Sequence, residues 1–128
     1  MADIVIIGAG VIGASIAANL TLRGERPLVL ERHHVCAGTT GQSGGVVRQH
    51  YSNPATAAMA RNALAVFRSW GDHFDGDPGF DEVGVMFPAG PETEAGIRAN
   101  VAEHLRLGID TSILTPDESR TVDSRVFV

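Results

Sequence analysis

The first thirty residues alternate between short apolar runs and breaks that are rich in glycine or charge. Residues 4–7 read IVII, a β-branched run typical of a parallel strand that is buried on both faces. From residue 11 to residue 22 apolar side chains recur at helical spacing, and Gly24 follows as a helix stop. Residues 27–30, PLVL, predict a second buried strand. A strand, a glycine turn, a helix and a strand predict a βαβ unit.

The pattern is less regular after the second strand. Residues 32–51 lack sustained periodicity and predict a long loop. Asn53 followed by Pro54 marks the start of a helix, with Asn53 as N-cap, and Gly71 is expected to end it. The apolar stripe of this helix consists of Ala57, Ala60, Leu64, Phe67 and Trp70.

The last third of the chain predicts two strands and two helices. Residues 83–87 and 111–114 are short apolar runs that we interpret as strands. Between them, Ile97, Val101 and Leu105 lie in line on an amphipathic helix that Gly108 closes. Thr115 and Glu118 have the spacing of a capping box, so another helix begins there. The fold class is therefore α/β.

Composition and charge exclude several classes of protein. The 128 residues suit one domain, and the net charge of −5 argues against nucleic acid or an anionic membrane as partner. Cys36 is the only cysteine, which excludes an intrachain disulfide. No basic segment precedes the first apolar run, and no apolar stretch approaches the roughly 20 residues of a membrane span. We expect a cytoplasmic protein.

The glycine turn after the first strand has the spacing GxGxxG. It follows a strand, opens a helix, and precedes an acidic residue, Glu31, at the end of the next strand. This context predicts a dinucleotide site in which the glycines allow a tight turn, close approach of a pyrophosphate and close packing of helix on strand. The expected site residues are Gly8, Ala9, Gly10, Val11, Ile12, Gly13 and Glu31. A tight turn in another kind of α/β domain is the alternative.

The acidic residue and the following loop narrow the choice of cofactor. A carboxylate at position 31 binds ribose hydroxyls and disfavours a 2′-phosphate, so FAD or NAD is preferred over NADP. In a NAD-dependent dehydrogenase, a further crossover normally follows the second strand. Here residues 38–48, GTTGQSGGVVR, form a glycine-rich loop that ends at Arg48. This loop argues against a NAD-dependent dehydrogenase.

Three segments together resemble the amine-oxidising FAD family that includes D-amino acid oxidase, dimethylglycine dehydrogenase and the sarcosine oxidase β-subunit. They are IVIIGAGVIGASIAANL at the start, LVLER around Glu31, and GTTGQSGGVVR. Weaker similarity in VGVMFPAG and LGIDTSILTPDES extends the resemblance over nearly the whole chain. It implies a Rossmann-like FAD-binding half at residues 1–80, followed at residues 81–128 by the first elements of a substrate domain, both incomplete.

The same resemblance implies roles for the loop. Arg32 would lie near the adenosine ribose, and Arg48 would pair with a substrate carboxylate or with charge on the flavin. His50 would face the active site, although a partly exposed loop histidine is the simpler interpretation. Gln42 stands where relatives with covalent flavin have a histidine, so FAD is expected to be non-covalent. Backbone groups along the flavin would come from Thr39, Thr40, Ser43, Gly44, Gly45 and Val46.

The resemblance implies oxidation of a C–N bond in an amino acid or N-methylated amino acid. The alternatives are a truncated or split-chain nucleotide-binding module without activity of its own, completed by a second chain, and a NAD-dependent dehydrogenase. We expect no metal, because His33, His34 and Cys36 lack a fourth ligand and match no zinc spacing.

Overall fold

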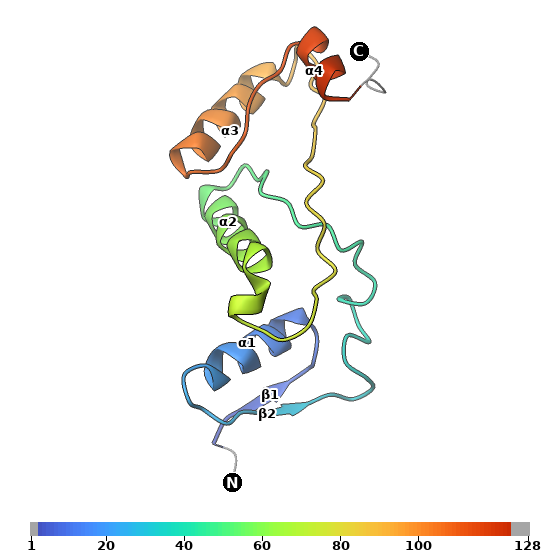
Figure 1. Cartoon of the computed structure of the whole chain (residues 1–128), viewed down its shortest axis with the longest axis vertical. Coiled ribbons are helices and arrows are strands. Elements are labelled where there is room, and N and C mark those ends of the chain that lie inside the picture. Colours follow the sequence, from blue (N-terminus) through green and yellow to red (C-terminus); the bar gives the residue numbers. More distant parts are fainter. Residues whose placement is uncertain (1–2, 124–128) are drawn as a thin grey trace. The chain divides into compact units, whose positions relative to one another are not determined.

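The computed structural model describes residues 3–123, which form parts of two compact units (Figure 1). The first unit is Met1–Val46 and the second is Val47–Val128. No helix in the described range is long and apolar enough to cross a membrane. Each unit is considered by itself below.

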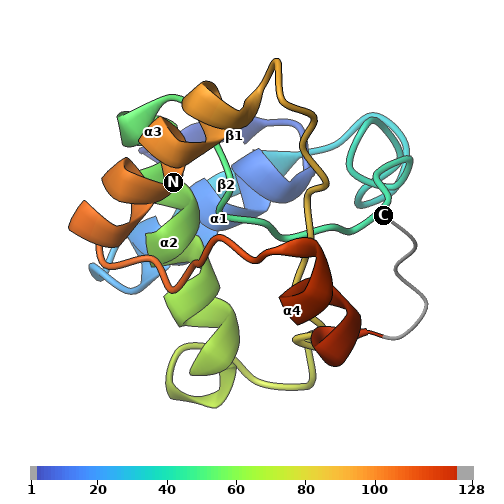
Figure 2. The same ribbon diagram turned by 90° about the horizontal axis from the view of Figure 1, so that it is seen from above.

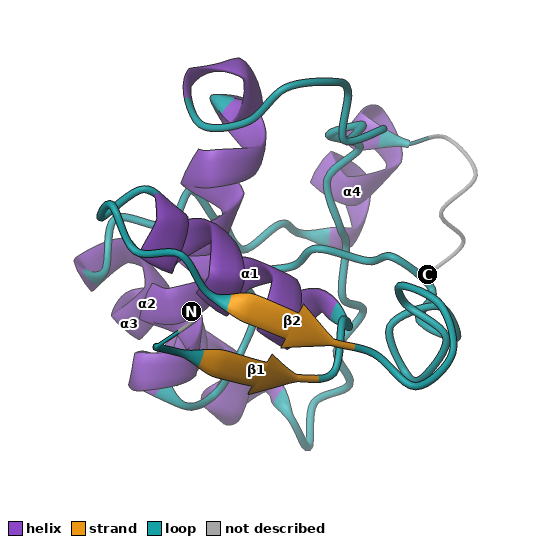
Figure 3. Ribbon diagram, turned by 90° about the horizontal axis from the view of Figure 1, so that it is seen from below, coloured by secondary structure: helices purple, strands orange, loops and turns teal. Residues whose placement is uncertain are grey.

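The first unit is a βαβ element. Strand β1 (Val5–Ile7), helix α1 (Val11–Thr21) and strand β2 (Leu28–Leu30) follow one another along the chain. The two strands pair in parallel, with Val5 opposite Leu28 and Ile7 opposite Leu30. Figure 3 shows the two arrows pointing the same way. The α/β class is confirmed, and so is the predicted order of strand, helix and strand in this unit.

Close packing of α1 on β1 depends on Gly13. A Cβ atom at this position would lie 1.9 Å from the carbonyl oxygen of Gly8 and 3.4 Å from Cγ2 of Ile6. The first distance is shorter than any real contact, so only a residue without a side chain lets the helix lie this close to the strand. Ile6 is the β1 residue that the helix covers.

The prediction that both strands are buried on both faces is wrong. Ile6 is 9% exposed, whereas Ile7 beside it is 88% exposed. Both Leu28 and Leu30 of β2 are also exposed. Within residues 3–123 the sheet has two strands and one covering helix, so side chains alternate between the helix-covered face and the open face. A strand with a continuous apolar run is buried on both faces only where other elements cover both faces of its sheet.

Helix α1 ends where the sequence predicts. The backbone N–H of Glu25 donates to the Leu20 carbonyl at 3.0 Å, which closes the last turn. Gly24 lies inside this closure with a φ of +87°, a conformation that a side chain makes unfavourable. The glycine therefore allows the chain to leave the helix and enter β2.

The second unit is helical. It contains α2 (Pro54–Arg68), a 3₁₀ turn η1 (Trp70–Asp72), α3 (Glu94–Arg106) and α4 (Pro116–Val122). Helices α2 and α3 contact each other and lie side by side in Figure 2. The predicted start of α2 is confirmed, because Asn53 Oδ1 accepts a hydrogen bond from Thr56 N at 3.1 Å.

The predicted end of α2 at Gly71 is wrong by about one turn. The α-helix ends at Arg68, and Ser69 departs from helical geometry with φ −116° and ψ +36°. The hydroxyl of Ser69 donates to the Ala65 carbonyl at 3.0 Å, a bond by which serine competes with the helical backbone. Trp70 consequently lies in η1, where it stacks on Phe67 with ring centroids 5.7 Å apart.

The two strands predicted in this unit are also wrong. Residues 83–87 and 111–114 carry no strand assignment, and neither pairs with another strand within the described range. A β-strand is stabilised by its neighbours, so an apolar run of this length stays an extended connector where no strand lies beside it.

Helix α3 is rotated relative to the predicted apolar line. Val101 is buried as expected, but Leu105 is 57% exposed and His104 takes the buried place beside Val101. Positions 101 and 104 are three residues apart, so their side chains lie on the same face of the helix. Among residues 3–123, His104 is the large side chain that reaches full burial, at 1% exposure.

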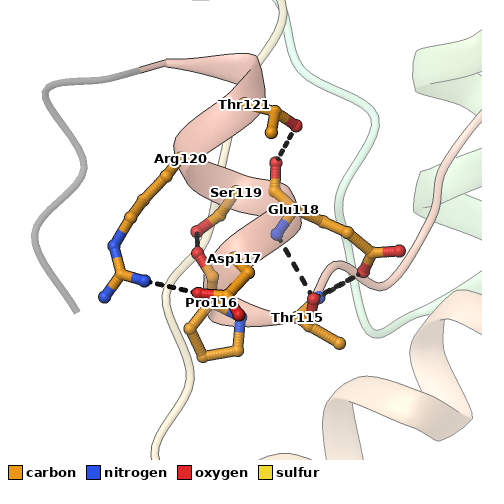
Figure 4. Close-up of polar contacts among 7 residues, drawn as sticks. All are labelled: Thr115, Pro116, Asp117, Glu118, Ser119, Arg120 and Thr121. Atoms are coloured by element: carbon orange, nitrogen blue, oxygen red, sulfur yellow. Dashed lines mark hydrogen bonds and ion pairs between the residues drawn. The ribbon is translucent and has the colours of Figure 1, made fainter.

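The predicted capping box at the start of α4 is confirmed (Figure 4). Thr115 Oγ1 accepts a hydrogen bond from Glu118 N, and Glu118 Oε2 accepts one from Thr115 N at 2.7 Å. Both donors would otherwise lack partners in the first helical turn. The helix start is therefore encoded locally, within four residues.

Candidate functional site

The glycine turn connects the end of β1 to α1. Gly8 has a φ of +102°, which favours glycine, and its N–H donates to the Leu30 carbonyl at 2.7 Å. Gly10 is the N-cap of α1 in an extended conformation. The turn is therefore fixed at one end to β2 and at the other to the first turn of an eleven-residue helix.

The N-terminus of α1 presents backbone donors. Within residues 3–123, the N–H groups of Gly10, Ile12 and Gly13 have no hydrogen-bond acceptor. No acidic side chain lies in the first turn of the helix. The partial positive charge of a helix N-terminus and unpaired N–H groups together suit an anion such as a phosphate.

Glu31 holds the turn from the carboxyl end of β2. Its Oε2 accepts a hydrogen bond from Ala9 N, and its Oε1 accepts one from His33 N, both at 2.9 Å. These bonds, first from Ala9 and then from His33, lower the pKa of Glu31. The carboxylate is exposed and charged at neutral pH, and each oxygen retains a lone pair for a further donor.

Thr40 folds the glycine-rich loop back onto the turn. Its Oγ1 accepts a hydrogen bond from Val11 N at 3.0 Å. A Cβ atom on Gly10 would lie 3.0 Å from the same oxygen, so glycine leaves room for this contact. The sequence predicted a role for the backbone of Thr40 and missed its side chain, because the two residues are 29 positions apart and no local pattern links them.

The rest of the loop is a series of tight turns, visible after β2 in Figure 2. The N–H of Cys36, whose φ is +62°, donates to the Ala9 carbonyl at 3.0 Å and so adds a second link to the glycine turn. Ser43 Oγ accepts from Gly45 N at 3.2 Å. The remaining expected cofactor residues of this segment are exposed to solvent; they are Arg32, Thr39, Gly44 and Val46.

Arg48 and His50 belong to the second unit. Arg48 is exposed, and its guanidinium carbon lies 5.1 Å from the ring centroid of Tyr51, a cation–π contact. The His50 ring stacks on Phe87 with centroids 4.4 Å apart. Burial lowers the pKa of His50, and the charges of His104 and Arg48 lower it further. His50 is therefore a packed side chain that favours its neutral form.

His104 is a second polar residue that sequence reasoning missed. Its Nε2 lies 2.8 Å from the carbonyl oxygen of Tyr51, and its ring meets His50 edge-on at 5.1 Å. The sequence signal for its burial was its position three residues after Val101, on the same face of α3. A histidine at such a position is ordinarily interpreted as a surface residue unless its distant partner is known.

The residues of the first unit fit a dinucleotide. Three unpaired N–H groups, the open space that Gly8 leaves and a helix N-terminus suit a pyrophosphate. An exposed carboxylate at the end of the second strand suits ribose hydroxyls. The residues expected from the motif therefore lie together, and Thr40 joins them.

Comparisons with known proteins agree with this geometry. Residues 3–126 match the family model of FAD-dependent oxidoreductases called DAO. The chain is 26% identical, over 97% of its length, to one of the subunits of the anaerobic glycerol-3-phosphate dehydrogenase of Escherichia coli K12. It is 29% identical, over 94% of its length, to mouse FAD-dependent oxidoreductase domain-containing protein 1.

A solved structure shares the fold. L-proline dehydrogenase from P. horikoshii superposes with a TM-score of 0.79 at 23% identity, over 94% of this chain and 32% of that one. The chain spans about a quarter of the curated relatives it matches, 23% of the bacterial dehydrogenase polypeptide and 27% of the mouse protein. The glycine turn, the acidic residue after β2 and the match over residues 3–126 place this chain in the DAO family of FAD-dependent oxidoreductases.

Proposed function

We propose that this chain supplies the FAD-binding turn and the substrate-binding arginine of an enzyme that oxidises a C–N bond of an amino acid or N-methylated amino acid. The observation that carries the substrate part is the exposed guanidinium of Arg48, held over the Tyr51 ring at the end of the glycine-rich loop. Membership in the FAD-dependent family supports the cofactor part.

The first unit would hold FAD non-covalently. The free N–H groups at the start of α1 would donate to the pyrophosphate, and Glu31 would accept from the ribose. Thr40 occupies the N–H of Val11 and so shapes the phosphate position from the loop side. The other groups proposed to contact FAD are Ala9, Arg32, Thr39, Ser43, Gly44, Gly45 and Val46. Gln42 has an amide side chain, which does not form a covalent bond to a flavin, so the proposed binding is non-covalent.

The chemistry that FAD would supply in this site is acceptance of a hydride equivalent from the substrate carbon next to nitrogen. Arg48 would pair with the substrate carboxylate, since a guanidinium binds a carboxylate through two parallel hydrogen bonds. That pairing would fix the orientation of the carbon that loses the hydride. Stacking on Tyr51 limits the conformations of Arg48 and so reduces the entropy lost on binding.

We also propose that residues 1–80 belong to the FAD-binding domain and residues 81–128 to the beginning of a substrate domain. A second chain or further residues would then complete the enzyme. Support comes from the fraction of its relatives that the chain spans, 23% of the bacterial dehydrogenase polypeptide.

Oxidation of a phosphorylated alcohol is the second candidate. One relative is named a glycerol-3-phosphate dehydrogenase, and a guanidinium binds phosphate as well as carboxylate. Arg48 alone therefore suits either anion. The two candidates differ in the bond that is oxidised, C–N or C–O, and a substrate panel distinguishes them.

The test adds sarcosine, D-alanine, L-proline or glycerol 3-phosphate, one at a time, to the FAD-bound protein in the absence of oxygen. Reduction of the flavin is measured as loss of its visible absorption. We expect bleaching by at least one amino or N-methylated acid. In steady-state assays Arg48→Ala should raise KM for that substrate by a factor on the order of ten to a hundred while FAD stays bound. Arg48→Lys, which keeps the charge and loses the paired geometry, should give a smaller increase.

Bleaching by glycerol 3-phosphate alone would contradict C–N oxidation and favour the second candidate. An unchanged KM in Arg48→Ala would remove this arginine from the substrate site.

A further inference from the structure

We propose that His104 is a positioning residue for Arg48, acting through Tyr51 and helped by the packing of His50 between His104 and Phe87. The inference deepens the proposed function, because it rests on Arg48 as the substrate-binding group. The residues involved all belong to the second unit.

The first step is the hydrogen bond between α3 and the segment that carries Arg48. His104 is 1% exposed, and its Nε2 lies 2.8 Å from the Tyr51 carbonyl oxygen, 53 residues earlier in the chain. A carbonyl only accepts, so Nε2 must carry the proton. A buried imidazole without this partner would lose a hydrogen bond that water cannot replace. The bond is therefore a tether between two distant parts of the chain.

The second step is the packing of His50. Its ring stacks on Phe87 at 4.4 Å with planes 26° apart, and it meets the His104 ring edge-on with planes 78° apart. His50 is next to Tyr51 in the chain, so the segment is held by a side-chain contact and by a backbone hydrogen bond. Two attachments at adjacent residues restrict both the position and the rotation of the backbone.

The third step leads from this backbone to Arg48. The guanidinium lies over the ring of Tyr51, the same residue whose carbonyl His104 binds. Displacement of the Tyr51 backbone would move the ring and remove the support of the guanidinium. His104 therefore acts on the arginine through one intermediate residue and contacts no substrate itself.

Charged side chains also act on the two imidazoles. Arg48 on the segment acts on His50 through its charge, and His104 interacts in the same way with its neighbour Glu103 on α3. A proton on His50 would add positive charge beside His104 and Arg48. The pKa of His50 is lowered by burial first and then by these neighbouring charges.

The test compares His104→Leu with His104→Gln in the complete flavoprotein that carries this sequence. Leucine fills the volume without a donor, whereas the glutamine amide can donate from the place of Nε2 and does not titrate. We expect His104→Leu to raise KM by about five- to thirty-fold, the effect of losing one buried hydrogen bond, with kcat and FAD affinity nearly unchanged. His104→Gln should stay within about three-fold of the wild type in KM.

The titration of His50 gives an independent readout. In His104→Gln the neighbouring imidazole charge is absent, so the pKa of His50, followed by NMR, should rise relative to the wild type. An unchanged KM in His104→Leu, or an equal rise of KM in both variants, would overturn the proposal.

Failure of the proposed function would look different. If Arg48 does not bind substrate, Arg48→Ala leaves KM unchanged, while the tether is still measurable without substrate. Long-range proton–nitrogen NMR spectra of the wild-type chain should show His104 protonated at Nε2, and His104→Leu should shift the backbone amide signals around Tyr51. A neutral ring protonated only at Nδ1 would overturn the positioning role by itself.

Discussion

At the scale of single residues, one carboxylate closes the glycine turn. Glu31 binds backbone N–H groups of Ala9 and His33 and still faces solvent. It can therefore fix the turn and accept from a ribose at once. The motif by itself predicts only the contact with the ribose, since the acidic residue follows the second strand in the fingerprint.

Replacement of Glu31 by alanine should weaken FAD binding by about ten-fold or more, because a hydrogen-bonded charge and the anchor of Ala9 are both lost. Isothermal titration with FAD measures the effect. Glu25→Ala is the matched control, since it removes an exposed carboxylate that follows α1 and makes no proposed contact with FAD. Equal affinity of Glu31→Ala and the control would mean that the ribose is held elsewhere.

The lowered pKa of Glu31 also predicts how stability depends on pH. A carboxyl group whose pKa falls on folding stabilises the folded state above its ordinary value of 4.5, and this contribution is lost as the pH falls through the lowered value. The melting temperature of the wild type should therefore exceed that of Glu31→Ala near neutral pH. The gap should narrow as the pH falls below 4.5 and close once it has passed through the lowered pKa. A gap that persists unchanged into strong acid would show that the charge of Glu31 is not what stabilises the turn.

Residues that belong to the glycine fingerprint could be located from the sequence, and residues whose partners lie outside it could not. Gly8, Gly13 and Glu31 follow the order of strand, turn, helix and strand that defines the fingerprint. Thr40 and His104 act on backbone groups 29 and 53 positions away. No periodicity or short motif encodes such a pairing, because it depends on how the chain folds back on itself.

At the scale of elements, Gly13 determines how closely α1 lies on β1. Gly13→Ala would place a Cβ atom 1.9 Å from the Gly8 carbonyl oxygen, which is backbone and cannot rotate away. Overpacking of this kind typically costs about 1–3 kcal/mol. Urea unfolding should show the loss as a lower midpoint.

The control for Gly13→Ala is Gly96→Ala. Gly96 lies inside α3 with no heavy atom within 4 Å of its added Cβ, and alanine is the better helix former by about 1 kcal/mol. The two substitutions are chemically identical and should change stability in opposite directions. A neutral Gly13→Ala would show that helix and strand can separate without cost.

Helices with local start signals were predictable, and isolated strands were not. The N-cap of Asn53 and the capping box of Thr115 and Glu118 use bonds within four residues. Strands at residues 83–87 and 111–114 were predicted from apolar composition alone. Their formation depends on a neighbouring strand, which no described residue supplies. The open face of β1 and β2 has a different cause, because burial of both faces needs covering elements on both and the described residues supply one helix.

At the scale of the whole molecule, the chain matches only part of the length of its relatives. It belongs to the FAD-dependent oxidoreductases and spans about a quarter of the curated relatives. Large apolar side chains are exposed on the sheet and on α1, among them Ile7, Ile12 and Leu30. The proposal that further chain completes the enzyme accounts for this exposure, since such residues are ordinarily covered.

The central claim is that the glycine turn, closed by Glu31 and Thr40, binds FAD. The most direct measurement is parallel titration of the purified protein with FAD and with NADH, followed by flavin and nicotinamide fluorescence. We expect saturable FAD binding with one site per chain, weaker in Glu31→Ala, and no saturable binding of NADH. Absence of FAD binding, or binding of NADH in its place, would contradict the claim.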